Sequence, residues 1–221
     1  MQRLLDILLT TDPRVRAGLV TTGFACLLMM FCILAIQMAA AAGMGDAQLV
    51  HWWSVGSAAC VLCSFALIRS GRTRHWRDPA FTAVQIGYAI VSNAVAYVIA
   101  GEARGIEPPI LAIAMMFGVF SLTPRQAKVL LLFGLASFAV AGAVAQWGRP
   151  HDAPPPMLGA VYMLIVTTVL LTSTALALHA HALREGLKRN RRELAQAVDR
   201  IQELATHDEL TGLPNRRYML E

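Results

Sequence analysis

Charged residues are scarce in this sequence. Of its 221 residues only 15% are Asp, Glu, Lys or Arg, whereas 56% are hydrophobic and the mean hydropathy is +0.53. A soluble globular domain carries about 25% charged residues, so this composition excludes an ordinary soluble domain. The apolar residues come in long runs separated by short charged or proline-rich breaks, which is typical of a polytopic helical membrane protein.

Catalytic and metal-binding patterns are also lacking. The sequence has no glycine-rich phosphate loop, no Ser/His/Asp arrangement with a nucleophile elbow, and no cluster with metal-ligand spacing. The four cysteines all lie inside apolar runs: Cys26, Cys32, Cys60 and Cys63. A CxxC pair indicates redox or zinc chemistry in a soluble protein. Here no His or Cys partner stands at ligand spacing, so we interpret these cysteines as small apolar residues and expect no metal and no cofactor.

Six apolar runs predict an all-α protein that spans a membrane six times. The predicted spans are Ala17–Ala42, Leu49–Ile68, Ala80–Ala100, Pro108–Leu122, Ala127–Trp147 and Met157–His179. About 20 helical residues cross the roughly 30 Å of bilayer hydrocarbon. The fourth run is short, because Ile110–Leu122 rises only about 20 Å. The first run exceeds the 7–15 apolar residues of a signal peptide, so we expect an uncleaved span. Residues 1–16 before it form a cytoplasmic interfacial segment, with a short surface helix at Leu4–Leu9.

Basic residues gather at one set of span ends. That set is Arg3, Arg14, Arg16, Arg69, Arg72, Arg74, Arg77, Arg125, Lys128, Arg184, Lys188, Arg189, Arg191 and Arg192. The opposite set has only Arg104 and Arg149, together with Asp46, Glu102, Glu107 and Asp152. The positive-inside rule therefore predicts that both chain ends are cytoplasmic. This placement and the lack of any nucleic-acid-binding motif argue against a nucleic-acid partner despite the net charge of +5.

The helices that begin on the basic side have clear start signals. Asp12-Pro13, Asp78-Pro79 and Thr123-Pro124 each place a capping side chain before a proline at the first helical position. Thr123 with Gln126 also predicts a capping box.

After the sixth span the sequence predicts an uninterrupted cytoplasmic helix over 180–206. Its apolar residues fit a heptad pattern, with Leu187, Leu194 and Ile201 at a and Leu183, Asn190, Ala197 and Leu204 at d. Such a seam favours a parallel homodimeric coiled coil, in which Asn190 costs stability but fixes the register. The alternative is an amphipathic helix that packs on another surface.

Polar residues inside the spans are the candidates for sensing. Gln85, Tyr88, Ser92, Asn93 and Tyr97 share one broad face of the third span. Gln37 and Gln146 stand near the outer ends of their spans. Most simply, these side chains form hydrogen bonds between helices, worth about 0.6 kcal/mol each. The functional alternative is a pocket for a small apolar or amphipathic ligand. No span is expected to carry a buried charge, which argues against an ion-coupled transporter.

Residues 208–217, near the C-terminal end of the sequence, form a recognisable sequence motif. Asp208, Leu210, Thr211, Gly212, Leu213, Pro214, Asn215, Arg216 and Arg217 form an Asp-x-Leu-Thr-Gly-Leu-Pro-Asn-Arg-Arg pattern. This pattern resembles the opening of the GGDEF domain of diguanylate cyclases, where it follows a long signalling helix. The resemblance implies that residues 17–179 are a MASE-like membrane sensor and anchor in the bacterial inner membrane. It further implies a signalling helix over 180–206 and the beginning of a GGDEF domain over 207–221.

The same resemblance implies a reaction. Diguanylate cyclases are dimeric enzymes that join two GTP molecules into cyclic di-GMP, with Mg²⁺ expected at the catalytic domain. None of that family's catalytic or metal-binding motifs occurs in these residues, so the parent protein is expected to be the enzyme and this chain to be inactive. Two alternatives stay open. One is the membrane receptor of a composite protein with a degenerate cyclase domain and a phosphodiesterase, and the other is a transporter-like bundle.

Overall fold

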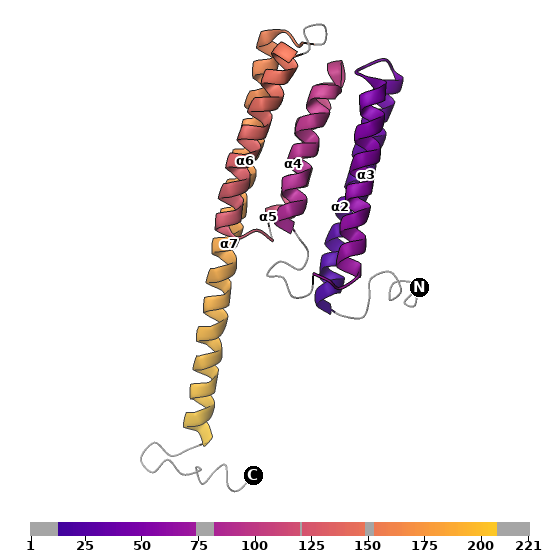
Figure 1. Cartoon of the computed structure of the whole chain (residues 1–221). Coiled ribbons are helices and arrows are strands. Elements are labelled where there is room, and N and C mark those ends of the chain that lie inside the picture. The colour runs from indigo at the N-terminus through magenta and orange to yellow at the C-terminus, as the bar shows by residue number, and fades with distance from the viewer. Residues whose placement is uncertain (1–12, 74–81, 120, 149–152, 207–221) are drawn as a thin grey trace. The chain divides into compact units, whose positions relative to one another are not determined.

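The computed structural model describes residues 13–73, 82–119, 121–148 and 153–206, and these residues form helices and short connections with no strand (Figure 1). The helices are α2 (Pro13–Ala41), α3 (Ala47–Arg69), α4 (Thr82–Ile99), the 3₁₀-helix η1 (Gly101–Ile106), α5 (Glu107–Val119), α6 (Pro124–Ala143), the π-helical turn η2 (Val144–Gly148) and α7 (Pro156–Thr206). The predicted surface helix at Leu4–Leu9, the caps at Asp12 and Asp78, and the 208–217 motif lie outside the described residues.

Five helical stretches are long and apolar enough to cross a membrane. They are Gly18–Ala41, Ala47–Arg69, Thr82–Ile99, Pro124–Gly148 and Pro156–Gln202. The all-helical membrane character predicted from the apolar runs is thus confirmed. The predicted span Pro108–Leu122 corresponds to α5, whose 13 residues rise only about 20 Å. Helix α5 alone is therefore too short to cross about 30 Å of hydrocarbon.

The largest apolar core joins α4, α5, α6 and the first half of α7. Its most buried members include Ile90, Leu111 and Leu170, each with no exposed surface. Tyr97 packs edge-on against Phe138, with ring centroids 6.3 Å apart. Gly134 lets α6 and α7 approach closely, since a Cβ there would stand 3.0 Å from the Leu170 side chain. These contacts hold the apolar part of α7 against α4 and α6.

Helices α2 and α3 form an antiparallel pair that packs on α4 through a second core (Figure 1). This core contains Ile36, Ala40, Val50, Ala96 and Ile99. The turn between the two helices is closed by Asp46, whose carboxylate accepts hydrogen bonds from the backbone N–H groups of residues 48 and 49 at 3.1 Å.

Large apolar side chains also cover the outside of the helices. Leu132, Leu164, Val84, Leu62 and Phe31 are each more than half exposed. A water-soluble protein rarely shows so much contiguous apolar surface, whereas a helix bundle in lipid presents it to the acyl chains.

The capping box predicted at the start of α6 is present. The Thr123 hydroxyl accepts from the Gln126 backbone N–H at 3.4 Å, and the Gln126 side chain accepts from the Thr123 backbone N–H at 2.9 Å. Together these bonds satisfy donors that a helix N-terminus would leave unpaired.

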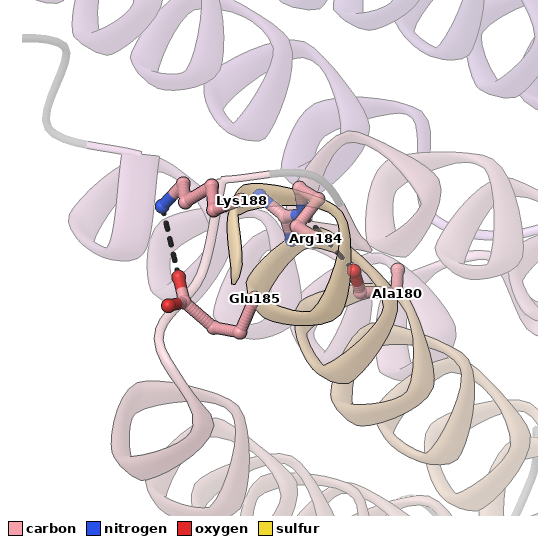
Figure 2. Close-up of polar contacts among 4 residues, drawn as sticks. All are labelled: Ala180, Arg184, Glu185 and Lys188. Atoms are coloured by element: carbon pink, nitrogen blue, oxygen red, sulfur yellow. Dashed lines mark hydrogen bonds and ion pairs between the residues drawn. The ribbon is translucent and has the colours of Figure 1, made fainter. Parts of the chain in front are cut away.

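Helix α7 is 51 residues long and contributes to both compact units of the chain, which meet between Leu178 and His179. In the second unit, Lys188 pairs with Glu185 at 2.8 Å and the Arg184 Nε donates to the carbonyl of Ala180 at 3.1 Å (Figure 2). The hydrogen bond from Lys188 lowers the pKa of Glu185. Such pairs at i,i+3 and i,i+4 support a helix in water by a few tenths of a kcal/mol each, about 0.2–0.5.

The turn at Gly45 yields a stability prediction. Gly45 has φ +89°, and a Cβ there would lie 2.7 Å from the carbonyl oxygen of Ile99. Gly43 has a similar φ of +85° but nothing within 4 Å. We expect Gly43→Ala to cost about 1–2 kcal/mol for its left-handed backbone, and Gly45→Ala to cost about 1–3 kcal/mol more because of the clash.

Thermal unfolding of both variants in the same detergent measures the difference. Equal melting temperatures for Gly43→Ala and Gly45→Ala would show that the close approach of this turn to the end of α4 is wrong.

Candidate functional site

A cavity of about 210 Å³ lies among α2, α3, α4 and α5. We name it the four-helix cavity. Its lining residues are Thr21, Thr22, Ala25, Leu28, Met29, Cys32, Cys60, Val61, Ser64, Leu67, Thr82, Val84, Gln85, Ile86, Tyr88, Ala89, Asn93, Ile110, Ala114 and Phe117. None of these lining residues carries a charge. Val84 at its rim is 66% exposed, so the cavity opens toward the outside of the bundle beside α4.

A network of hydrogen bonds between helices lies beside this cavity and reaches it at Tyr88. The Tyr88 hydroxyl donates to Ser57 Oγ at 3.1 Å, and Ser57 Oγ lies 3.2 Å from Ser92 Oγ. The Trp53 Nε1 donates to the same Ser92 Oγ at 3.1 Å. This chain of hydroxyls joins α3 to α4; Ser57 and Ser92 at its centre are buried, and Tyr88 and Trp53 are partly exposed.

A separate bond ties α4 to α2, because the Gln85 Nε2 donates to Thr22 Oγ1 at 3.1 Å. Thr22 is only 1% exposed. Both Gln85 and Thr22 line the cavity, so this bond fixes the distance between two of its walls.

Asn93 differs from its polar neighbours. Its side chain is buried, with the residue only 6% exposed, and its Nδ2 donates to the Ala89 carbonyl at 3.1 Å. Its Oδ1 has no hydrogen-bond partner among the described residues. A buried acceptor left unpaired costs about 1–3 kcal/mol. One residue that lines the cavity therefore carries a polar atom that the described protein atoms do not satisfy.

The structure divides the seven polar residues grouped by the sequence. Gln85, Tyr88 and Asn93 line the four-helix cavity, while Ser92 lies in the hydroxyl chain beside it. Gln37 donates to Ser54 Oγ at 3.0 Å and lines no cavity described here.

Tyr97 and Gln146 line a different cavity, of about 470 Å³, which lies between α6, η2, α4 and the beginning of α7. Gln146 therefore shares a cavity with Tyr97 of the polar face of α4 but not with Gln85, Tyr88 or Asn93, and Gln37 lines neither of the two cavities.

Two charges that the sequence assigned to the connection between the third and fourth predicted spans are buried. Arg104 is 3% exposed and Glu107 is 1% exposed. The Arg104 Nε donates to the Gly101 carbonyl, and its guanidinium lies 5.6 Å from the centre of the Tyr97 ring. Glu107 Oε1 has no hydrogen-bond partner within the described ranges. Both residues lie between the predicted spans Ala80–Ala100 and Pro108–Leu122, so the expectation that no span carries a buried charge did not cover them and does not weigh against a transporter.

The sequence also missed the contributions of α2 and α5 to the cavity. Cys32 on α2 and Ile110, Ala114 and Phe117 on α5 lie in uniformly apolar runs. Nothing in such a run marks one face as facing a cavity. Glu107, Ile110, Ala114 and Phe117 are spaced so that they share one face of α5. The charge of Glu107 at the start of α5 was the one feature of the sequence that could have marked this face as facing inward.

No family model, no curated protein and no solved structure matches this chain. Among the described residues there is also no group of His, Cys, Asp or Glu that could hold a metal ion. The site must therefore be interpreted from its own geometry, which is that of a small, uncharged, largely apolar cavity.

The hydroxyl chain yields a second stability prediction. Ser57→Ala removes two of the hydrogen bonds between α3 and α4 and leaves those from Trp53 to Ser92, whereas Ser64→Ala removes only a bond to Cys60 of the same helix. We expect Ser57→Ala to destabilise the bundle by about 0.6–1.7 kcal/mol and Ser64→Ala to have almost no effect. Thermal unfolding in detergent measures both, and a larger loss for Ser64→Ala would contradict the assigned network.

Proposed function

We propose that this chain is the membrane sensory and dimerisation module of a diguanylate cyclase, the enzyme that makes cyclic di-GMP from two GTP molecules. The observation that carries the proposal is α7, an unbroken helix from Pro156 to Thr206. Its first half is apolar and packs in the bundle core, and its second half is charged. It ends directly before the Asp208–Arg217 motif that resembles the start of a GGDEF domain. GTP and Mg²⁺ belong to the catalytic part, which these residues do not include.

The exposed stripe on the second half of α7 supports a dimeric stalk. Leu183, Leu187, Leu194 and Ile201 are each more than half exposed. A lone helix in water gains little stability from propensity, and helices of this kind depend on covering an apolar face. A second copy covers this stripe through a and d packing, and Asn190 at a d position sets the register. The side chain of Leu204, the last d position, lies outside the described side chains.

A dimeric stalk gives the sensor a way to act. By the resemblance, each cyclase domain brings one GTP, so product forms only when two domains face each other. Rotation or sliding of two paired helices changes that arrangement, and a bundle with two packings can bias it.

We further propose that η1 and α5 together make the sixth membrane crossing. Ala103 at the start of this segment packs with Ala39 and Ala100, and a Cβ on Gly118 at its end would meet the Ile86 side chain. The segment therefore runs beside α4 over nearly its whole height. Six 3₁₀ residues rise about 12 Å and α5 rises about 20 Å, which together match about 30 Å of hydrocarbon. Six crossings put both ends on the basic, cytoplasmic side of the bacterial inner membrane.

A transporter-like bundle is the second candidate, and the buried Glu107 favours it. Ionisable side chains inside a membrane bundle often mark ion or proton pathways. If proteoliposomes containing the chain show solute uptake that Glu107→Gln abolishes, transport replaces the sensory proposal.

Cysteine cross-linking tests the stalk. In a background that lacks the four native cysteines, Leu194→Cys stands at an a position and Arg192→Cys at an f position of the same helix. In a parallel dimer the a positions of the two copies meet, while the f positions point away from each other. We expect mild oxidation of membranes to produce a disulfide-linked dimer from Leu194→Cys and little from Arg192→Cys.

The cysteine-free chain is the control for collisional aggregation and should give no dimer. Equal cross-linking at the two positions, or cross-linking only at Arg192→Cys, would contradict the dimeric stalk.

A further inference from the structure

We propose that the four-helix cavity binds one small, neutral molecule that has an apolar body and a hydroxyl hydrogen-bond donor, such as an alkyl phenol. The identification of this ligand as a stimulus rests on the proposed sensory function. Its binding, in contrast, follows from the cavity alone. Four observations carry the inference: the size of the cavity, its lack of charge, the unsatisfied Asn93 Oδ1 and the position of the cavity against the core of α4.

The volume sets the size of the ligand. At about 210 Å³ the cavity corresponds to roughly seven waters at about 30 Å³ each. An engineered apolar cavity of about 150 Å³ stays dry and binds benzene. The four-helix cavity therefore fits one substituted aromatic ring or a short alkyl chain. It is too small for a nucleotide or a whole lipid.

The lining sets the charge of the ligand. It consists mainly of aliphatic, Met, Cys and Phe side chains, and none of its members is charged. An ion moved into such surroundings without a partner would lose several kcal/mol of hydration. The occupant must therefore be neutral.

Asn93 sets the polar group of the ligand. The Asn93 Nδ2 donates to the Ala89 carbonyl, and this bond fixes the orientation of the side-chain amide. If the amide were rotated to exchange its O and N atoms, Oδ1 would face the carbonyl oxygen, and two acceptors cannot form a hydrogen bond. Oδ1 is then an acceptor without a partner, on a residue that is more than nine-tenths buried and lines the cavity. A ligand that donates a hydrogen bond recovers the cost of this unpaired atom.

Neighbouring polar groups strengthen the preference for a donor. The Tyr88 hydroxyl and the Gln85 Nε2 both line the cavity and both already donate to protein oxygens, Ser57 Oγ and Thr22 Oγ1. A ligand that can only accept would have to compete with Ser57 for the single hydroxyl hydrogen of Tyr88. A hydroxyl on the ligand fits without breaking either of these bonds between helices.

The cavity is placed so that its occupancy acts on α7. Ile86 lines the cavity and also belongs to the main core, where Ile90 one turn later packs near Gly134 and Leu170. An occupant therefore presses on the face of α4 that holds the membrane part of α7. A ligand that prefers one packing of these helices shifts the population of that packing.

Binding of a matched ligand pair tests the proposal. The full chain is placed in phospholipid nanodiscs and titrated by calorimetry with 4-propylphenol and with 4-propylanisole, its methyl ether, which lacks the donor. Empty nanodiscs give the lipid background. We expect saturable binding with a Kd for the phenol about tenfold lower than that for the ether, as for one buried hydrogen bond.

Three variants locate the site. Asn93→Leu keeps the side-chain volume and should reduce the phenol-to-ether preference to about onefold. Ala25→Leu fills the cavity from α2 and should weaken the binding of both probes about tenfold or more. Thr168→Val removes a hydroxyl that bonds only within α7 and should leave both affinities unchanged.

Equal affinities for the two probes in the unchanged chain would overturn the proposal. A phenol-to-ether preference that survives Asn93→Leu would also overturn it. Uptake of the probes no greater than that of empty nanodiscs would overturn it as well and would indicate that a lipid acyl chain fills the cavity. If Asn93→Leu does not fold, the probe preference of the unchanged chain and the Ala25→Leu result decide. Because binding is measured on the chain itself, failure here leaves the cyclase proposal standing, and failure of the stalk leaves the binding result standing.

Discussion

The structure depends on one constraint, which is that backbone N–H and C=O groups in hydrocarbon must find partners within the protein. In the described residues the chain meets this constraint with helices almost throughout. Side chains cap the N-terminal ends of two of these helices. Asp46 caps α3 and the Thr123–Gln126 box caps α6. Beside the Asp46 cap, Gly45 and Gly101 adopt left-handed backbone conformations and pack directly against each other. Side chains with polar groups then either bond to a neighbouring helix or, like Asn93, stand beside a cavity.

The apolar runs predicted the helices well, because a helix in lipid needs a long apolar stretch and little else. Four predicted spans match helical stretches within a few residues at both ends, the sixth begins within one residue of α7, and the Thr123 cap is where the sequence placed it. The short fourth span was harder. The sequence could not show that Gly101–Ile106 would form a 3₁₀-helix directly before α5, since this segment contains charges and glycines that are typical of a loop.

The site was less predictable for a related reason. Polarity identified Gln85, Tyr88 and Asn93 on α4, because polar side chains avoid lipid. It could not separate them from Gln37 and Gln146, which look alike in sequence but lie elsewhere. The apolar walls from α2 and α5 gave no signal, because a side chain facing a cavity and one facing lipid have the same chemistry. The burial of Arg104 and Glu107 likewise depends on how η1 folds back against Tyr97.

In the account as a whole, a small ligand in the four-helix cavity biases the packing of α4 against the membrane part of α7, and the unbroken α7 carries that bias toward the Asp208–Arg217 motif. The central claim is that helical phase is transmitted along α7. The most direct test joins the chain at this motif to an active diguanylate cyclase domain and inserts residues between Glu193 and Leu194. Seven inserted residues preserve the heptad register, whereas four rotate everything beyond them. The account predicts that cyclic di-GMP production survives the seven-residue insertion and changes severalfold with four. Equal production from both proteins would contradict it.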